Sequence, residues 1–407
     1  MSLLSYEQIE TFLRDGLLVV QEGFLSAAQL ADARAGLQAT LARHGVDTND
    51  LATTGANLTT LSSTAGSGGV LDVFYDEWKM NIALHPVLHA WTRQLWQAAY
   101  CHQGEASWQD LAANDQFKWH PYGPVDHANS GGYVYIDRIC YRLPTALSDE
   151  IGRRTLSSSS NVTNNKKKKN KKKLSLQRSL TPHLDCCPDT FDDPTHHSKW
   201  RPIQCFVSLT DNVEPNTGGL EVAKGFHREF RHWAETRTPT VVKDRQTGQT
   251  KSIPAPCLGE YTHIRPVEEA AVMQRVQHVP VAAGAVVFWD NRLPHANAYR
   301  HDGSQPRAVV YCSFLPPIAL NRAYAQRQLQ AWLAGRTPTD QWRGNNSAAA
   351  AAAAAAATTV TSTTTSTDET TTSDTKNDEA VVNIELLRQR LNQLPALSRK
   401  LLALEDW

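Results

Sequence analysis

Three side chains, His183, Asp185 and His295, place the strongest constraint on how this chain can fold. His183 and Asp185 are two positions apart, and side chains two apart on an extended strand point to the same face. One strand can therefore supply two metal ligands, and His295, far downstream, can supply the third. Two imidazoles and one carboxylate are the ligand set of the facial triad, which holds non-haem Fe(II) and leaves coordination positions open.

A single His-x-Asp is expected by chance about once in a chain of this length, so the motif alone is a weak signal. The sequence around it strengthens the prediction. Residues 200–210 are typical of a β-strand, and the polar, glycine-containing residues 211–219 are typical of the turn that closes it. Further strands are predicted over residues 284–290, just before His295, and over residues 307–314.

The order of motifs resembles that of a known family. His183-Leu184-Asp185 is followed by Asn216-Thr217-Gly218-Gly219-Leu220, by Gly225-Phe226-His227, and then by a hydrophobic strand, His295 and Arg307. Over residues 5 to about 320 this order resembles the phytanoyl-CoA dioxygenase-like group of Fe(II)/2-oxoglutarate-dependent oxygenases.

The resemblance implies that His183, Asp185 and His295 ligate iron and that Arg307 binds the distal carboxylate of 2-oxoglutarate. A guanidinium suits this role because it pairs with a carboxylate through two parallel hydrogen bonds. Arg300 is a competing candidate, but it lies in a polar loop, whereas Arg307 opens a predicted strand. Relatives often carry a hydroxyl residue two positions after this arginine, and Val309 stands there instead.

Four further residues are predicted to contact the cosubstrate. Tyr311 shares a strand face with Arg307, and Asn297 lies two residues beyond His295, where relatives place a polar contact. Gln204 shares a face with Phe206 and Ser208 on the preceding strand. The fourth residue, Arg138, belongs to a predicted strand over residues 133–142.

Alternation along the strand over residues 133–142 predicts two faces. It places Arg138 and Arg142 on one face and Tyr135, Asp137 and Tyr141 on the other. Either face could meet the ligand, and an ordinary half-exposed strand with ion pairs remains an alternative.

The remaining histidines and cysteines favour structural roles. His196 and His197 are adjacent and indicate a loop, His227 resembles a structural turn of the family, and Cys186 and Cys187 are typical of small buried side chains. The seven cysteines include no Cys-x-x-Cys pair, which predicts free thiols in a reducing compartment.

The predicted fold is mainly β with flanking helices: a double-stranded β-helix of the jelly-roll or cupin-like kind, over residues 1–335. Capping boxes at Ser5–Gln8 and Ser26–Gln29 predict a helix, strand, helix entry. Residues 155–179, rich in Ser, Asn and Lys, are predicted to be a disordered insertion, and residues 336–379 a low-complexity linker. Residues 380–407 carry an apolar stripe that predicts a helical segment, which docks on the barrel or makes a dimer contact.

Charge and hydropathy bear on partners and location. The 41 basic and 41 acidic side chains balance, which gives no general attraction to nucleic acid or membranes. No apolar run approaches the roughly 20 residues that span a bilayer, and the first residues lack the plan of a signal peptide. We expect a cytoplasmic protein, with a nuclear location left open by the lysine run at residues 166–173.

Together with the candidate triad, the resemblance implies an oxygenase that uses Fe(II), 2-oxoglutarate and O2 and that hydroxylates a small metabolite or lipid-like substrate. The carboxylate of Asp185 favours hydroxylation over halogenation, while desaturation and ring closure stay open. One alternative is a nuclear oxygenase of protein or nucleic acid. Another is a barrel that binds a metal or ligand without catalysis. The sequence leaves the substrate and the oligomeric state, monomer or dimer, undetermined.

Overall fold

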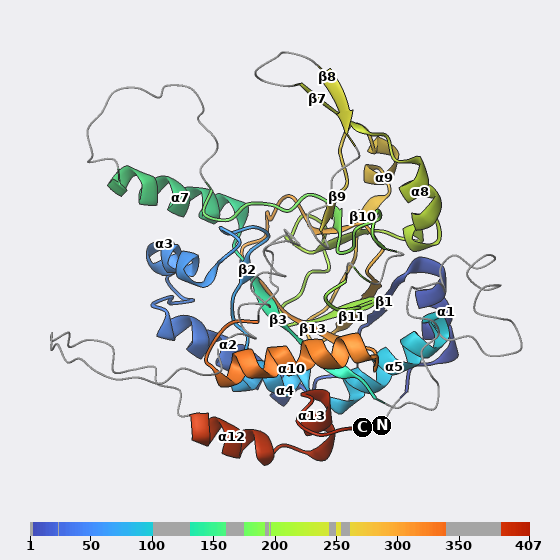
Figure 1. Cartoon of the computed structure of the whole chain (residues 1–407). Coiled ribbons are helices and arrows are strands. Elements are labelled where there is room, and N and C mark those ends of the chain that lie inside the picture. The colour runs from blue at the N-terminus through green and yellow to red at the C-terminus, as the bar shows by residue number, and fades with distance from the viewer. Residues whose placement is uncertain are drawn as a thin grey trace, which may run out of the picture.

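Two antiparallel sheets form the centre of the computed structural model (Figure 1). The structure describes residues 3–22, 24–100, 131–159, 175–191, 195, 197–243, 250–253, 261–338 and 384–407. Within these residues the two sheets do not join into a closed barrel. A sheet-rich fold with flanking helices is thus confirmed, but barrel closure is not seen.

The larger sheet has six strands, and every neighbouring pair is antiparallel. Its order is β1 (Leu17–Val20), β11 (Val286–Asp290), β5 (Ile203–Ser208), β13 (Arg307–Leu315), β3 (Tyr133–Arg142) and β2 (Val70–Leu71). The strands predicted over residues 17–20 and 133–142 are confirmed at the same bounds.

The smaller sheet has five short strands. Its order is β10 (Val276–His278), β6 (Leu220–Ala223), β12 (His295–Asn297), β4 (His183–Leu184) and β9 (Thr262–His263). A separate hairpin of β7 (Thr240–Lys243) and β8 (Thr250–Ile253) projects beyond it in Figure 1.

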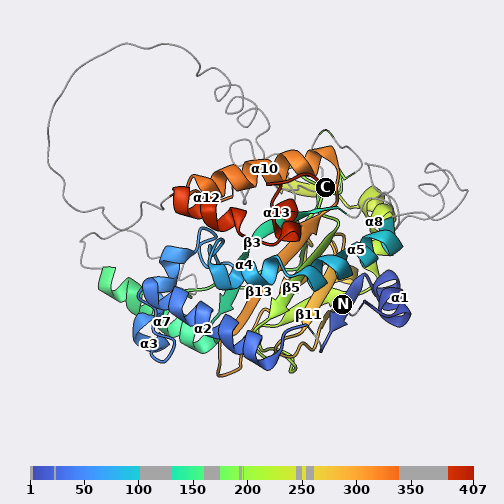
Figure 2. The ribbon, with the colours of Figure 1, turned by 90° about the horizontal axis from the view of Figure 1, so that it is seen from below.

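Helices cover the outer face of the larger sheet, as the view from below shows (Figure 2). The longer helices of this layer are α2 (Ala27–Arg43), α5 (Pro86–Tyr100) and α10 (Ala319–Leu333), with the short α4 (Glu77–Ala83) between them. The remaining helical elements are α1 (Tyr6–Asp15), α3 (Leu51–Thr54), η1 (Gly55–Leu61), α7 (Thr145–Ser159), η3 (Phe226–Arg228), α8 (Phe230–Thr236) and α9 (Ala270–Met273), followed by α12 (Ile384–Asn392) and α13 (Ala396–Leu401).

The alternation of strand residues creates two apolar layers. Ile136, Val207 and Phe288 pack with the helices, while Phe206 and Val287 face the smaller sheet and pack between the sheets. Each strand of the larger sheet is therefore buried on both faces. This explains why these segments read as nearly continuous apolar runs rather than as strict alternation.

The N-terminal entry follows the predicted pattern. Both capping boxes are present: the Ser5 and Ser26 side chains accept from the backbone N–H groups of Gln8 and Gln29. The first helix ends at Gly16, whose φ of 65° lies in the left-handed region that favours glycine.

The C-terminal segment packs on the rest of the chain. Leu391, Leu401 and Leu402 are buried in the layer of apolar residues beneath the larger sheet. The indole of Trp407 donates a hydrogen bond to the Gly132 carbonyl at 2.9 Å. Docking, the favoured expectation for this segment, is what the structure shows.

The predicted low-complexity segments are only partly described. Residues 155–159 continue α7, and the side chain of Gln177 is buried and donates to the Tyr141 carbonyl, so residues at both ends of the predicted insertion belong to the fold. The rest of that insertion, with the lysine run, and nearly all of the linker at 336–379 lie outside the described residues. Among the described helices, none combines the length and apolarity needed to cross a bilayer.

Candidate metal centre

His183, Asp185 and His295 come together at the start of two neighbouring strands. His183 opens β4 and His295 opens β12, and the two residues are paired in register. The Nε2 atom of His183 lies 3.7 Å from Asp185 Oδ1, and that of His295 lies 3.6 Å from Asp185 Oδ2. One ligand atom from each residue can be chosen so that all three lie within 4.8 Å of one another.

Backbone carbonyls orient both imidazole rings. Nδ1 of His183 lies 3.0 Å from the Thr181 carbonyl oxygen, and Nδ1 of His295 lies 2.9 Å from that of Leu293. A carbonyl oxygen can only accept, so each neutral ring carries its proton on Nδ1. The Nε2 lone pairs are then left to face the carboxylate, which is the arrangement that a bound metal requires of histidine ligands.

The protonation equilibria fit this arrangement. Burial and the neighbouring His295 lower the pKa of His183 to about 4, so its ring is neutral at pH 7. Burial raises the pKa of Asp185, but the close approach of His295, His183 and Arg201 outweighs it and holds that pKa well below its usual range. Asp185 is therefore a carboxylate at every physiological pH.

Aromatic and basic side chains line the surroundings of the triad. The Tyr261 ring stacks on His183, with 4.6 Å between centroids, and the Trp289 ring lies 5.3 Å from His295. Arg201 reaches Asp185 Oδ2 at 3.9 Å and Asp137 Oδ2 at 3.1 Å. Sequence reasoning missed Tyr261 and Arg201, because neither belongs to a motif that identifies it.

Three residues that are each predicted to contact the cosubstrate are linked by hydrogen bonds: Arg307, Asn297 and Tyr311. Nη1 of Arg307 donates to Asn297 Oδ1 at 2.8 Å, and Nδ2 of Asn297 lies 3.5 Å from the Tyr311 hydroxyl. Asn297 lies on β12 two residues after His295, so alternation points it to the same side as the metal ligand. The guanidinium of Arg307 is buried, and its Nε atom has no hydrogen-bond partner among the described residues.

Gln204 also reaches the space between the sheets. It is paired in register with Trp289 on β11 and with Ser313 on β13. Its side-chain Nε2 is buried and makes no hydrogen bond within the part of the chain that the structure describes. A buried amide donor of this kind is available to a bound ligand.

Arg138 points away from this space, contrary to the prediction. Its Nε donates to Asp72 Oδ1 at 2.6 Å, and its guanidinium lies over the Phe74 ring, on the helix side of the sheet. The pairing of β3 with β13 shifts register where Val310 pairs with Ile139 and Cys312 with Ile136. This β-bulge adds a residue to β3 and breaks the alternation that would have placed Arg138 and Arg142 on one face.

Arg142, rather than Arg138, points into the space between the sheets where a cosubstrate contact was predicted. It is paired in register with Arg307, and its side chain is 4% exposed. Nη2 donates to the Tyr299 carbonyl at 3.0 Å, while Nε and Nη1 have no partner among the described residues. Burial lowers the pKa of Arg142, and the nearby charge of Arg307 lowers it further. The two arginines make the interior beside the triad strongly attractive to an anion.

Among the histidines and cysteines that the sequence assigns to structural roles, one departs from its prediction. Nε2 of His227 lies 3.1 Å from the Leu13 carbonyl, and that of His197 lies 2.9 Å from the Thr190 carbonyl; His196 is outside the described residues. Cys186 is buried and free. Cys187 is disulfide-bonded, so the expectation that all thiols stay free is wrong at this position.

A two-layered antiparallel fold that gathers two histidines, an aspartate and two buried arginines defines a candidate metalloprotein with an anion-binding interior. A family model described as Gig2-like matches residues 179–370, slightly less than half of the chain. That range contains the three triad residues and Arg307 but not Arg142. The comparison with curated proteins found no match.

Solved structures with the same fold come from a yeast and a bacterium. GlcNAc Inducible Gene 2 (GIG2) from Candida albicans is 15% identical, with 84% of this chain and 73% of that chain covered and a TM-score of 0.55. A putative oxidoreductase from Salmonella typhimurium LT2 is 14% identical, with 84% and 79% covered and a TM-score of 0.53. At such identities these likenesses show the fold alone.

A weaker likeness is to the epimerase SnoN of nogalamycin biosynthesis, solved in complex with Fe3+ and alpha-ketoglutarate. It is 16% identical, with 76% of this chain and 82% of that chain covered, and its TM-score of 0.37 is too low to carry an argument. The matching family model is the Gig2-like one, so the narrower resemblance to phytanoyl-CoA dioxygenases is not supported.

Proposed function

We propose that this chain is an Fe(II)- and 2-oxoglutarate-dependent oxygenase that hydroxylates a small metabolite or lipid-like substrate. The observation that carries the proposal is the convergence of three lone-pair-bearing groups, His183 Nε2, His295 Nε2 and the Asp185 carboxylate, in a buried place. Acceptors that face one another without a donor are unfavourable unless a cation lies between them. Two imidazoles and one carboxylate favour Fe(II) among the common metals.

The arginine pair supports a dicarboxylate as the second ligand. Arg307 is positioned by Asn297, which is only two residues from His295, so the cation and the metal ligands share one short strand. Arg142 adds buried donors that have no partner among the described residues. In this proposal Arg307 and Arg142 bind the distal carboxylate of 2-oxoglutarate, and Gln204 and the Tyr311 hydroxyl supply further hydrogen bonds.

When bound, iron with 2-oxoglutarate and O2 supplies the oxidising chemistry, which turns the cosubstrate into succinate and CO2. The residues of the chain hold and orient these groups. Thr181 and Leu293 keep the histidine rings in the metal-binding tautomer, and Arg201 adds positive charge beside the Asp185 carboxylate. The carboxylate of Asp185 would serve as a metal ligand where a halogenase would bind chloride, so hydroxylation is the favoured outcome.

The test is an anaerobic titration of the full chain with Fe(II) and 2-oxoglutarate, following the visible charge-transfer band of the chelate. We expect a band in the wild type, none in Asp185→Ala, and a higher 2-oxoglutarate requirement in Arg307→Ala. His232→Ala, which removes an exposed histidine of α8, is the matched control and should leave the band unchanged. Absence of a band in folded wild type would overturn the proposal and favour a non-catalytic binding protein.

A further inference from the structure

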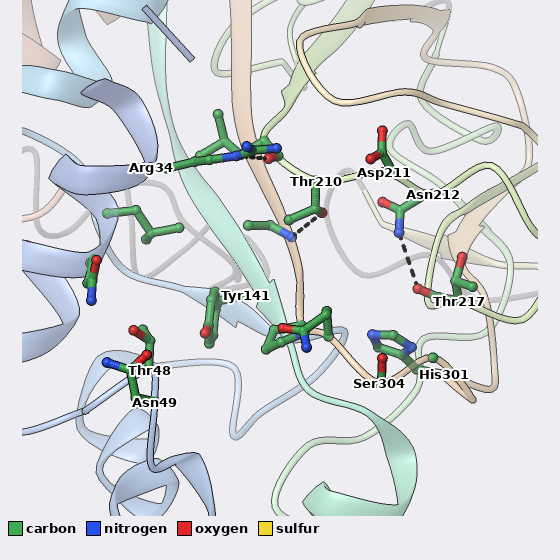
Figure 3. Close-up of a pocket in the computed structure, with 17 residues that line it drawn as sticks. Arg34, Thr48, Asn49, Tyr141, Thr210, Asp211, Asn212, Thr217, His301 and Ser304 are labelled. Atoms are coloured by element: carbon green, nitrogen blue, oxygen red, sulfur yellow. Dashed lines mark hydrogen bonds between the residues drawn. The ribbon is translucent and has the colours of Figure 1, made fainter. Parts of the chain in front are cut away.

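A cavity of about 640 Å3 lies beside Tyr141, on the helix side of the larger sheet (Figure 3). Its floor includes Tyr141 of β3 and Ala308 of β13, which are paired in register. The adjacent residues, Arg142 and Arg307, point to the other face, so the cavity is separated from the candidate metal centre by the sheet itself. One wall comes from α2. Its residues Arg34, Leu37 and Gln38 line the cavity together because residues three and four apart share a helix face.

Two buried side chains in the wall each keep a polar atom without a hydrogen-bond partner among the described residues. His301 is 2% exposed; the Gln305 backbone approaches one of its ring nitrogens, and the other has no partner there. Asn212 is 4% exposed; its Nδ2 donates to the Thr217 carbonyl at 3.3 Å, while its Oδ1 has no partner there. Leaving such groups unsatisfied costs about 1–3 kcal/mol each. They are therefore available to a ligand that can donate and accept.

The position of His301 is fixed by its backbone. The His301 N–H donates to the Thr145 hydroxyl at 2.9 Å, and the His301 carbonyl accepts from the Thr145 N–H at 2.8 Å. Burial and the nearby charge of Arg142 lower the pKa of His301 to about 4, so the ring is neutral at pH 7. A neutral imidazole offers one donor and one acceptor.

The charges around the cavity are few and balanced. Arg34 donates from Nε to the Leu209 carbonyl at 2.7 Å, and Asp211 accepts from the Ala283 N–H at 2.8 Å. Most other polar groups in the lining are amides and hydroxyls, such as those of Asn49, Gln305 and Ser304. The lining residues therefore carry no net charge, although the charge of Arg142 also acts on His301 from outside the lining.

We propose that this cavity binds a neutral polyhydroxylated molecule of about the size of a monosaccharide. A hydroxyl can donate to Asn212 Oδ1 and can either donate to or accept from His301, whereas an ammonium group can only donate and a carboxylate can only accept. Tyr141, Leu37 and Ala308 provide an apolar surface for the C–H face of such a ring. The volume lies within the usual range for small-molecule sites. This site is additional to the proposed oxygenase centre and does not depend on it.

The test is ligand-observed saturation-transfer NMR on the full chain. The neutral probes are D-glucose, D-ribose and myo-inositol, and D-glucuronate and D-glucosamine are charged compounds of matched size. We expect saturation transfer to at least one neutral probe. The charged compounds should bind at least about tenfold more weakly, a difference in binding free energy similar to that of one good hydrogen bond.

Variants locate the binding. Asn212→Ala should weaken it about tenfold. Because a core substitution can impair folding, Thr48→Trp is the second variant: it narrows the cavity from a half-buried position and should abolish binding. Thr59→Trp, at an exposed position that does not line the cavity, is the matched control and should bind as wild type. Failure of all three neutral probes to bind, or undiminished binding in Thr48→Trp, would overturn the proposal.

Discussion

Arg142 and Arg307 face each other across β3 and β13, buried side by side with no ion pair to a carboxylate among the described residues. Two buried cations repel each other and have lost hydration, so the arrangement is costly without an anion. This cost is the physical reason to expect an anionic ligand beside the triad.

Replacing Arg142 should weaken the binding of 2-oxoglutarate. Arg142→Met removes charge-assisted hydrogen bonds worth about 1.5–3 kcal/mol, so the concentration needed to form the chelate should rise about ten- to a hundredfold. Arg142→Lys should recover part of the loss, because it keeps the charge but not the fork of donors. Arg138→Met is the control. It breaks the contact with Asp72 on the helix side and should leave the cosubstrate affinity unchanged. Equal effects of the two methionine variants would contradict the assignment of Arg142.

Metal binding should stabilise the protein through the triad alone. A metal that binds only the folded state at about a hundred times its dissociation constant adds about 2.7 kcal/mol to the free energy of unfolding. Thermal unfolding under anaerobic conditions should show this increase with Fe(II), and a chelator should reverse it. Asp185→Ala should lose the response, whereas His232→Ala should keep it. A full response in Asp185→Ala would place the metal elsewhere.

The network of Asp290, Arg292 and Tyr100 should account for part of the loss of stability in acid. Arg292 donates to Asp290 from Nε at 2.8 Å and from Nη2 at 2.7 Å, and all three side chains are buried. Burial raises the pKa of Asp290, but the charge of Arg292 and its hydrogen bonds outweigh this and lower the pKa below 3.8. The unfolded chain therefore takes up the proton first as the pH falls. The stabilisation is complete above about pH 4 and is lost below it.

Asp290→Asn tests this network by denaturant unfolding at neutral and acid pH. At pH 7 the variant should lose about 3–5 kcal/mol, because Arg292 keeps a buried charge without its partner. Its stability should also fall less steeply in acid than that of the wild type. Glu150→Gln, which removes an exposed partner of Arg154, should change the free energy of unfolding by less than about 1 kcal/mol. A neutral effect of Asp290→Asn at pH 7 would show that the pair does not stabilise the fold.

Lys79 should make the protein more stable as the pH rises. It is fully buried, and its Nζ donates to the Phe74 carbonyl at 3.2 Å. Burial lowers its pKa from 10.5. Between the lowered pKa and 10.5 the unfolded chain binds more protons than the folded chain, so the free energy of unfolding increases with pH across this window.

Lys79→Met should remove that dependence and raise stability at pH 7, because it removes the cost of burying the ammonium group. Urea unfolding between neutral and alkaline pH measures both effects. Lys224→Met, at an exposed position, should change neither. A less stable Lys79→Met at pH 7 would mean that the ammonium group contributes net stabilisation.

Local sequence signals predicted much of the fold. The capping boxes at Ser5 and Ser26 gave the starts of two helices, because a serine followed three residues later by glutamine satisfies free N–H groups at a helix start. The proximity of His183, Asp185 and His295 was also predictable, because the first two are two positions apart on a strand and the three residue types are a known metal-ligand set. The role of Arg307 came from the family resemblance and stays a prediction.

Features that depend on tertiary structure were not predictable. The bulge in β3 results from pairing with β13 and leaves no mark in the alternation of residues 133–142. Arg138 and Arg142 therefore looked equivalent in sequence, although one contacts Asp72 and the other faces Arg307. Tyr261 and Arg201 approach the triad from segments whose sequences do not mark them as site residues. The cavity above Tyr141 depends on loops that meet only after folding.

The one extra residue of the bulge in β3 decides which side chains of the strand face the helices and which face the smaller sheet. Ile136 pairs with Cys312 and Ile139 with Val310, so the extra residue is accommodated between them and both ends of β3 keep their pairing with β13. Deleting a residue beyond the bulge, such as Cys140, would instead shift the end of the strand by one position. Arg142 would then take the place of Tyr141, and its guanidinium would enter the apolar layer beneath the sheet. The number of residues in this short segment is thus more tightly constrained than their identity. Insertions or deletions of the kind that surface loops tolerate should disrupt the candidate site here.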